Sequence, residues 1–154
     1  MNASDEKESN EGLRPLLREL LGRTRLAVLS THHSGQPYAS LVAFASSDDL
    51  RYLYFVTPRT TRKFGNLQSD GRIALLIDSR SNAPTDFHEA MAVTVVGRAR
   101  EISGPEKQTA LNRYLEKHPY LEEFAASPTC AFVQVDARTY ILVKNFQHVM
   151  ELHL

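Results

Sequence analysis

The pattern of apolar and polar residues along this chain predicts a fold made mostly of β-strands. Short apolar or alternating runs between turn-forming residues are typical of strands, and apolar residues three and four positions apart are typical of amphipathic helices. The first pattern predicts strands at residues 25–31, 38–46, 50–57, 72–78, 91–102, 130–137 and 139–154. The second predicts helices at residues 12–22, 59–69 and 105–118, with a short further helix at 120–125.

The order of these elements indicates the fold class. The strands dominate and occur in clusters, so the strand–helix alternation of a doubly wound sheet is missing. We therefore expect a closed antiparallel β-barrel with peripheral helices, in one domain over residues 12–154. Residues 1–11 are polar and acidic, and we interpret them as a disordered tail. Residues 32–37 are expected to form a hairpin loop, Asn10 to cap the first helix, and Gly97 to mark a bulge or a close backbone approach.

Composition and charge exclude several classes of function. Lys and Arg together number 18, as do Asp and Glu, so the chain lacks the basic excess that sequence-independent nucleic-acid binding needs. No apolar run approaches the ~20 residues that span a bilayer, so no membrane partner is expected. Cys130 is the single cysteine and cannot form an internal disulfide, which favours a reducing cytoplasm. His32 and His33 have no companions at metal-ligand spacing, so no metal site is predicted.

Basic and hydroxyl side chains gather in the stretch TPRTTRKFGNL, which joins a predicted strand to a predicted helix at residues 57–67. A helix start carries unpaired N–H groups and a partial positive charge, so Arg62 and Lys63 lie where cations are unfavourable. A bound anion would reverse this, because each charge-assisted hydrogen bond contributes about 1.5–3 kcal/mol. The residues alone leave two interpretations open: an anion site, or a solvated helix start whose cations bend away.

Several motifs, in this order, resemble the flavin-binding split-barrel family of pyridoxamine 5′-phosphate oxidase-like proteins. They are LAVLST, PYASLVAF, LYFVT followed by T-x-x-TRK-x-x-NL, DGRIALLI and VTVVGRAREI, and the resemblance covers residues 13–102. The resemblance implies a six- to seven-stranded antiparallel split β-barrel that forms a homodimer, with FMN at the subunit interface. Some members of the family use a deazaflavin instead.

The resemblance also implies which residues contact the cofactor. Arg62 and Lys63 would hold the FMN phosphate, with a hydroxyl from Thr60 or Thr61. The isoalloxazine ring would lie along Ser40, Leu41 and Val42, and the ribityl chain along Val56 and Thr57, while the partner subunit would add residues from its later strands. The residues alone also allow Ser40, Leu41 and Val42 to be plain barrel core.

Departures from the family pattern bear on the reaction. The chain has no Trp, and Ala92 stands where a glutamine is expected, so vitamin B6 phosphate is not the expected substrate. We expect an FMN-dependent oxidoreductase acting on an unidentified small molecule, and no side chain is assigned a catalytic role. Two different functions also fit the sequence: a cofactor-binding dimer without turnover, and a haem-binding or haem-degrading protein. The haem interpretation depends on the APTDFHEA loop and on His148 and His153 near the C-terminus, which also fit a solvated strand.

Overall fold

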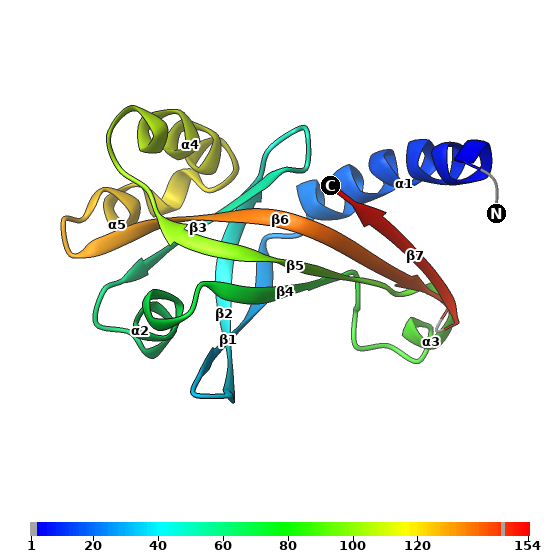
Figure 1. Cartoon of the computed structure of the whole chain (residues 1–154), viewed down its shortest axis with the longest axis horizontal. Coiled ribbons are helices and arrows are strands. Elements are labelled where there is room, and N and C mark those ends of the chain that lie inside the picture. Colours follow the sequence, from blue (N-terminus) through cyan, green and yellow to red (C-terminus); the bar gives the residue numbers. More distant parts are fainter. Residues whose placement is uncertain (1–2, 146) are drawn as a thin grey trace.

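A computed structural model of the protein describes residues 3–145 and 147–154. Its described part contains one sheet of seven antiparallel strands (Figure 1). The strands are β1 Leu26–His33, β2 Gln36–Ser46, β3 Tyr52–Pro58, β4 Arg72–Asp78, β5 Met91–Glu101, β6 Cys130–Lys144 and β7 His148–His153. The helices are α1 Ala3–Arg23, α2 Arg62–Ser69, α3 Asp86–Glu89, α4 Gly104–Lys117 and α5 Glu122–Ala126, with a 3₁₀ turn, η1, at Pro119–Leu121.

Six of the strands close into a barrel, and the seventh extends the sheet beyond it. The strand order is β3-β2-β1-β4-β5-β6-β7, and a second pairing between β3 and β6 completes the ring. This confirms the predicted mainly β fold and its antiparallel barrel of six to seven strands. Helices α4 and α5 lie at one end of the elongated molecule and α3 at the other, and α1 projects past β7 (Figure 1).

Apolar side chains form two clusters on opposite sides of the barrel wall. The larger cluster fills the barrel, where α1 contributes four buried leucines, Leu13, Leu17, Leu20 and Leu21. The smaller cluster lies between strands β3 and β6 and helices α4 and α5, and includes Tyr54, Val56, Tyr114 and Phe132. Every strand of the wall therefore buries its inner face, and β3 and β6 bury part of their outer face as well.

Two predicted boundaries near the N-terminus differ from the structure. Helix α1 begins at Ala3, so Asn10 lies inside it, and residues 3–11 are helical where we predicted a disordered tail. This stretch contains Ala, Glu and Lys, which are good helix formers and extend a helix already anchored from Leu13 onward. The predicted loop at 32–37 is in fact a two-residue turn, because Ser34 and Gly35 both adopt positive φ and so match the twist of the hairpin.

The last strand boundary also differs from the prediction. We placed a break after residue 137, whereas β6 continues to Lys144, and the chain turns at Asn145 with a φ of 51°. A bulge accounts for the error: Val96 pairs with Thr139 and Gly97 with Ala137, so Arg138 is left without a partner on β5. Arg138, the residue between the two predicted strands, is the extra residue of this bulge. The structure thereby confirms the irregularity predicted at Gly97.

Candidate functional site

The basic stretch forms the connection from β3 to α2, and Thr61 caps the start of this helix. The Thr61 backbone is extended, and its Oγ1 accepts a hydrogen bond from the Phe64 N–H at 3.4 Å. The first turn of α2 contains no acidic residue. The partial positive charge of the helix start is therefore not offset by any side chain of its own turn.

The three basic residues of the stretch have different surroundings. Arg59 makes a two-pronged ion pair with Glu101, with N–O distances of 2.9 and 3.2 Å, and also donates to the Pro128 carbonyl. Arg62 is exposed, and its guanidinium carbon lies 5.2 Å from the centre of the Tyr38 ring. Within the described residues, neither Arg62 nor Lys63 pairs with a carboxylate. Two uncompensated cations thus accompany the uncompensated start of α2.

Hydroxyl groups connect the end of β3 to the start of α2. The Oγ1 atoms of Thr57 and Thr61 lie 2.7 Å apart, and each also lies within hydrogen-bonding distance of the Pro58 carbonyl. Each hydroxyl has one proton to donate, so one threonine donates to the other and the second donates to Pro58. Thr60 is exposed and has no hydrogen-bond partner within the described chain. Its hydroxyl is the one in this connection that remains available to a ligand.

The predicted residues of β2 and β3 do not all point the same way. Ser40 and Val42 point towards the barrel, whereas the side chain of Leu41 points outward and is 64% exposed. Ser40 Oγ is buried and has no hydrogen-bond partner among the described groups. Val56 packs in the cluster beneath α4 and α5, on the other side of the wall from Thr57, so it could contact a ligand near Thr57 only through its backbone.

Sequence reasoning missed two further contributors to this region. Tyr38 lies beneath Arg62, and nothing in the local pattern of β2 distinguishes it from other strand aromatics. Asn66 is buried on α2, and its Nδ2 donates to Thr31 Oγ1 on β1 at 3.1 Å. Asn66 lies one helical turn after Arg62, on the polar side of the predicted helix, so the local pattern gave no signal that it would be buried.

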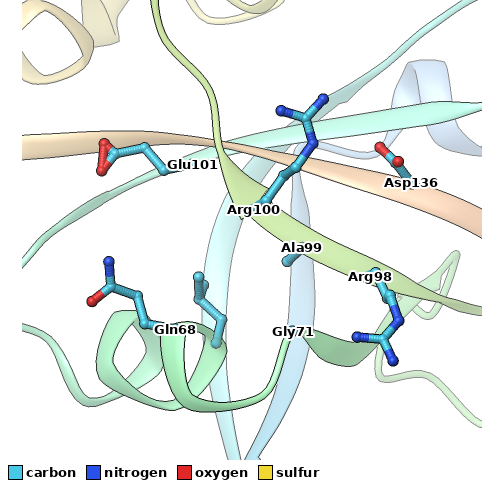
Figure 2. A pocket seen from close by; sticks show the side chains of 8 residues that line it. Gln68, Gly71, Arg98, Ala99, Arg100, Glu101 and Asp136 are labelled. Carbon is cyan, nitrogen blue, oxygen red and sulfur yellow. The ribbon is translucent and has the colours of Figure 1, made fainter.

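A separate hollow of about 630 Å³ lies at the opposite end of α2 (Figure 2). Gln68 of α2 and Arg98 and Arg100 of β5 line it, together with Glu101. Arg100 is paired with Glu106 at 2.6 Å, and Glu101 is paired with Arg59. Two of its four charged residues are thus paired with neighbours, and the lining also includes the acidic Asp136, so this hollow attracts anions less than the start of α2 does.

A second hollow, of about 690 Å³ and mainly apolar, lies between β1, β2 and the end of α4. Leu26, Lys117 and His118 line it. Burial lowers the pKa of Lys117 to about 8, and its Nζ donates to the Leu21 carbonyl at 2.7 Å. Burial also lowers the pKa of His118, so its ring is neutral near pH 7 and its Nε2–H donates to the Phe44 carbonyl at 2.7 Å.

The described part of the chain contains no helix of the length and apolarity that crossing a bilayer requires.

A family model described as pyridoxamine 5′-phosphate oxidase matches residues 13–147, which extends past the motifs quoted above. Comparison with curated protein sequences gives no match. Solved structures similar to the chain include a haem-binding protein from Mycobacterium smegmatis, with a TM-score of 0.79, 16% identity, and coverage of 94% of this chain and 57% of that one. Another is the protein Atu2129 of unknown function from Agrobacterium tumefaciens, with a TM-score of 0.75, 22% identity, and coverage of 87% and 57%.

A FAD-binding protein from Mesorhizobium loti is also similar, with a TM-score of 0.64, 17% identity, and coverage of 89% of this chain and 90% of that one. The chain thus spans just over half the length of the Mycobacterium and Agrobacterium proteins. At these identities the likeness concerns the fold, and it leaves open which ligand this chain binds.

Proposed function

Because the chain belongs to the pyridoxamine 5′-phosphate oxidase family, we propose that it binds FMN and acts as a flavin-dependent oxidoreductase on a small molecule. One observation carries the proposal: Arg62 and Lys63 lie at a helix start without acidic residues, and neither has a carboxylate partner among the described residues. Cations gathered at such a position are unfavourable by themselves and become favourable with a bound phosphate.

The surrounding residues suit the remainder of a flavin nucleotide. Thr60 offers a free hydroxyl to the phosphate, and the N–H groups of the first turn of α2 point the same way. Thr57, at the end of β3, lies next to this group through Thr61. Ser40 Oγ is a buried polar atom that needs a hydrogen-bond partner, as the polar edge of a flavin ring would supply. We keep Leu41, Val42 and Val56 as ring and ribityl contacts, with Val42 and Val56 contributing through their backbone.

When bound, FMN supplies the electron transfer, and the protein supplies binding and orientation. The chain's own residues hold the phosphate, align the ring along β2 and exclude water from it. No side chain is assigned a catalytic role. The cytoplasm remains the expected compartment, since the lone Cys130 is buried and unpaired.

We also propose that two copies of the chain pair through the outer face of the sheet. Strand register places Val28, Leu41 and Leu76 side by side on this face, and Ala74 beside Val96. Leu26, Leu41, Leu76 and Val96 are between 38% and 64% exposed. An apolar surface that crosses four neighbouring strands is typical of a protein interface. Leu41 belongs both to this face and to the proposed cofactor contacts, so pairing here would place the cofactor beside the subunit interface.

Haem binding is the second candidate, favoured by the similarity to the Mycobacterium haem-binding protein. His148 and His153 are the histidines expected to act in that case. His153 is already engaged, with Nδ1 3.2 Å from Thr139 Oγ1 and Nε2 3.1 Å from a Glu151 oxygen. His148 is exposed on β7 and remains the freer of the two. The same fold would also suit a deazaflavin in place of FMN, or a cofactor-binding dimer without turnover.

The absorbance spectrum of the purified protein, followed by titration with FMN, tests the proposal. We expect flavin bands, and quenching of flavin fluorescence on binding. Arg62→Ala combined with Lys63→Ala should weaken FMN binding about 100-fold, since two charge-assisted hydrogen bonds are lost. Arg98→Ala, an exposed arginine beside the other hollow, is the matched control and should bind as the unmodified protein does. A Soret band without flavin binding would instead support the haem candidate.

A further inference from the structure

Asn66 is the buried polar residue of α2, and among the described residues its side chain bonds to a partner on a different part of the barrel. Its side chain is 7% exposed, and it is one of the three buried residues of the helix, with Phe64 and Leu67. Its Nδ2 donates to Thr31 Oγ1, and Thr31 is itself 3% exposed on β1. This bond joins residues 35 positions apart.

The bond joins two sides of a ring of neighbouring residues that includes Arg62. Thr31 is the direct cross-strand partner of Tyr38 in the β1–β2 pairing, so their side chains lie on the same face of the sheet. The guanidinium carbon of Arg62 lies 5.2 Å from the centre of the Tyr38 ring. Arg62 is in turn one helical turn before Asn66 on α2. These relationships connect Arg62 to Asn66, Asn66 to Thr31, Thr31 to Tyr38, and Tyr38 back to Arg62.

Helix α2 has eight residues, and so short a helix has little stability of its own. Thr61 connects its first turn to β3, and the buried Phe64 and Leu67 pack the helix against the barrel core. The Asn66–Thr31 bond adds a directional contact that ties the second turn to β1. A directional bond between buried groups determines orientation more narrowly than apolar packing does.

We propose that Asn66 and Thr31 are positioning residues, which fix α2 so that Arg62 and its helix start face a phosphate bound beside the first residues of β2. The proposal rests on the proposed function. Its consequence is selective: loss of the bond should reduce the contribution of the phosphate to binding and leave contacts to the ring in place. The ratio of affinities for FMN and riboflavin, which lacks the phosphate, measures that contribution.

The experiment determines dissociation constants of both flavins by fluorescence quenching for Thr31→Val, Asn66→Leu and the double variant. Each single change should lower FMN affinity about tenfold and leave riboflavin affinity unchanged. A loss of about tenfold is typical of residues that orient a ligand-contacting group without touching the ligand themselves. The double variant restores thermal stability, because neither partner is left unpaired, but keeps the reduced preference for FMN. Thr31→Ser retains the hydroxyl and should bind as the unmodified protein does.

A purely structural role predicts the opposite pattern: equal losses for both flavins, and full recovery in the double variant. Either of these results, or an unchanged ratio, overturns the inference while FMN binding by the unmodified protein still supports the proposed function. If a single variant fails to fold, the double variant provides the same comparison. If the unmodified protein binds no FMN, the proposed function and this inference both fail.

Discussion

The hydroxyl oxygens of Thr57 and Thr61 lie 2.7 Å apart, which joins the last residues of β3 to the residue that caps α2. Thr57 is 1% exposed, so this partly buried contact is shielded from water on the β3 side. Because Thr61 also accepts the Phe64 N–H, one side chain both ends the loop and begins the helix. The cap is thus part of the structure that presents Arg62 and Lys63.

Replacing Thr61 by alanine should lower the free energy of unfolding by about 1 kcal/mol, because the helix loses its capping acceptor. Urea denaturation measures this loss. Thr60→Ala is the matched control: its side chain is exposed and unbonded within the described chain, so the free energy should change by less than about 0.5 kcal/mol. Equal losses in both variants would contradict the role given to the cap.

Leu76→Asp should turn a dimer into a monomer, because it puts a charge at the centre of the outer apolar face. Sedimentation velocity at micromolar concentration measures the outcome. Phe124→Asp is the matched control, since Leu76 and Phe124 are 38% and 39% exposed but Phe124 lies on α5, away from this face. A monomeric unmodified protein, or dissociation by both variants, would contradict the proposed interface.

Gly97→Ala should destabilise the fold by at least about 2 kcal/mol, since the added Cβ would lie 2.3 Å from the Asp136 carbonyl oxygen on β6. Backbone atoms surround the site and cannot rotate away. Gly12→Ala provides the comparison, because nothing lies within 4 Å of a Cβ built there and alanine favours a helix by up to about 1 kcal/mol. Thermal unfolding should therefore shift in opposite directions for the two variants.

The lowered pKa of Lys117 predicts that the free energy of unfolding rises with pH in the alkaline range. Burial lowers its pKa from 10.5 to about 8 in the folded protein. Between these values the unfolded chain binds more protons than the folded chain, so raising the pH through this window favours folding. Above about pH 10 the buried tyrosines act in the opposite direction, because burial raises the pKa of Tyr114 to about 12 and unfolding lets it ionise earlier.

Denaturant unfolding at intervals between pH 7.5 and 9.5 measures this slope, and Lys117→Met should remove most of it. A slope that persists unchanged in Lys117→Met would assign the effect to other groups.

Local pattern was enough to predict the barrel strands, because each is a short run of apolar or alternating residues that lies between turn-forming residues. The bulge opposite Gly97 was harder to predict, because a polar residue inside a strand looks the same in the sequence as a polar residue in a turn. The basic stretch was enough to select Arg62 and Lys63 as candidate phosphate contacts, because the argument for them depends on charges within a few residues of sequence. Tyr38 and the Asn66–Thr31 bond escaped detection, because they require knowledge of which strands become neighbours.

Strand β6 completes the ring through its pairing with β3, and residues 52–58 meet residues 130–136 there. During synthesis, one edge of β3 therefore stays unpaired until more than half of the chain that follows β3 has left the ribosome. An open edge of this kind, with apolar side chains, is prone to pair with other chains. The closing contact spans a long stretch of sequence, so barrel closure should be a slow, late step of folding. The period before it is when the nascent protein most needs chaperone protection.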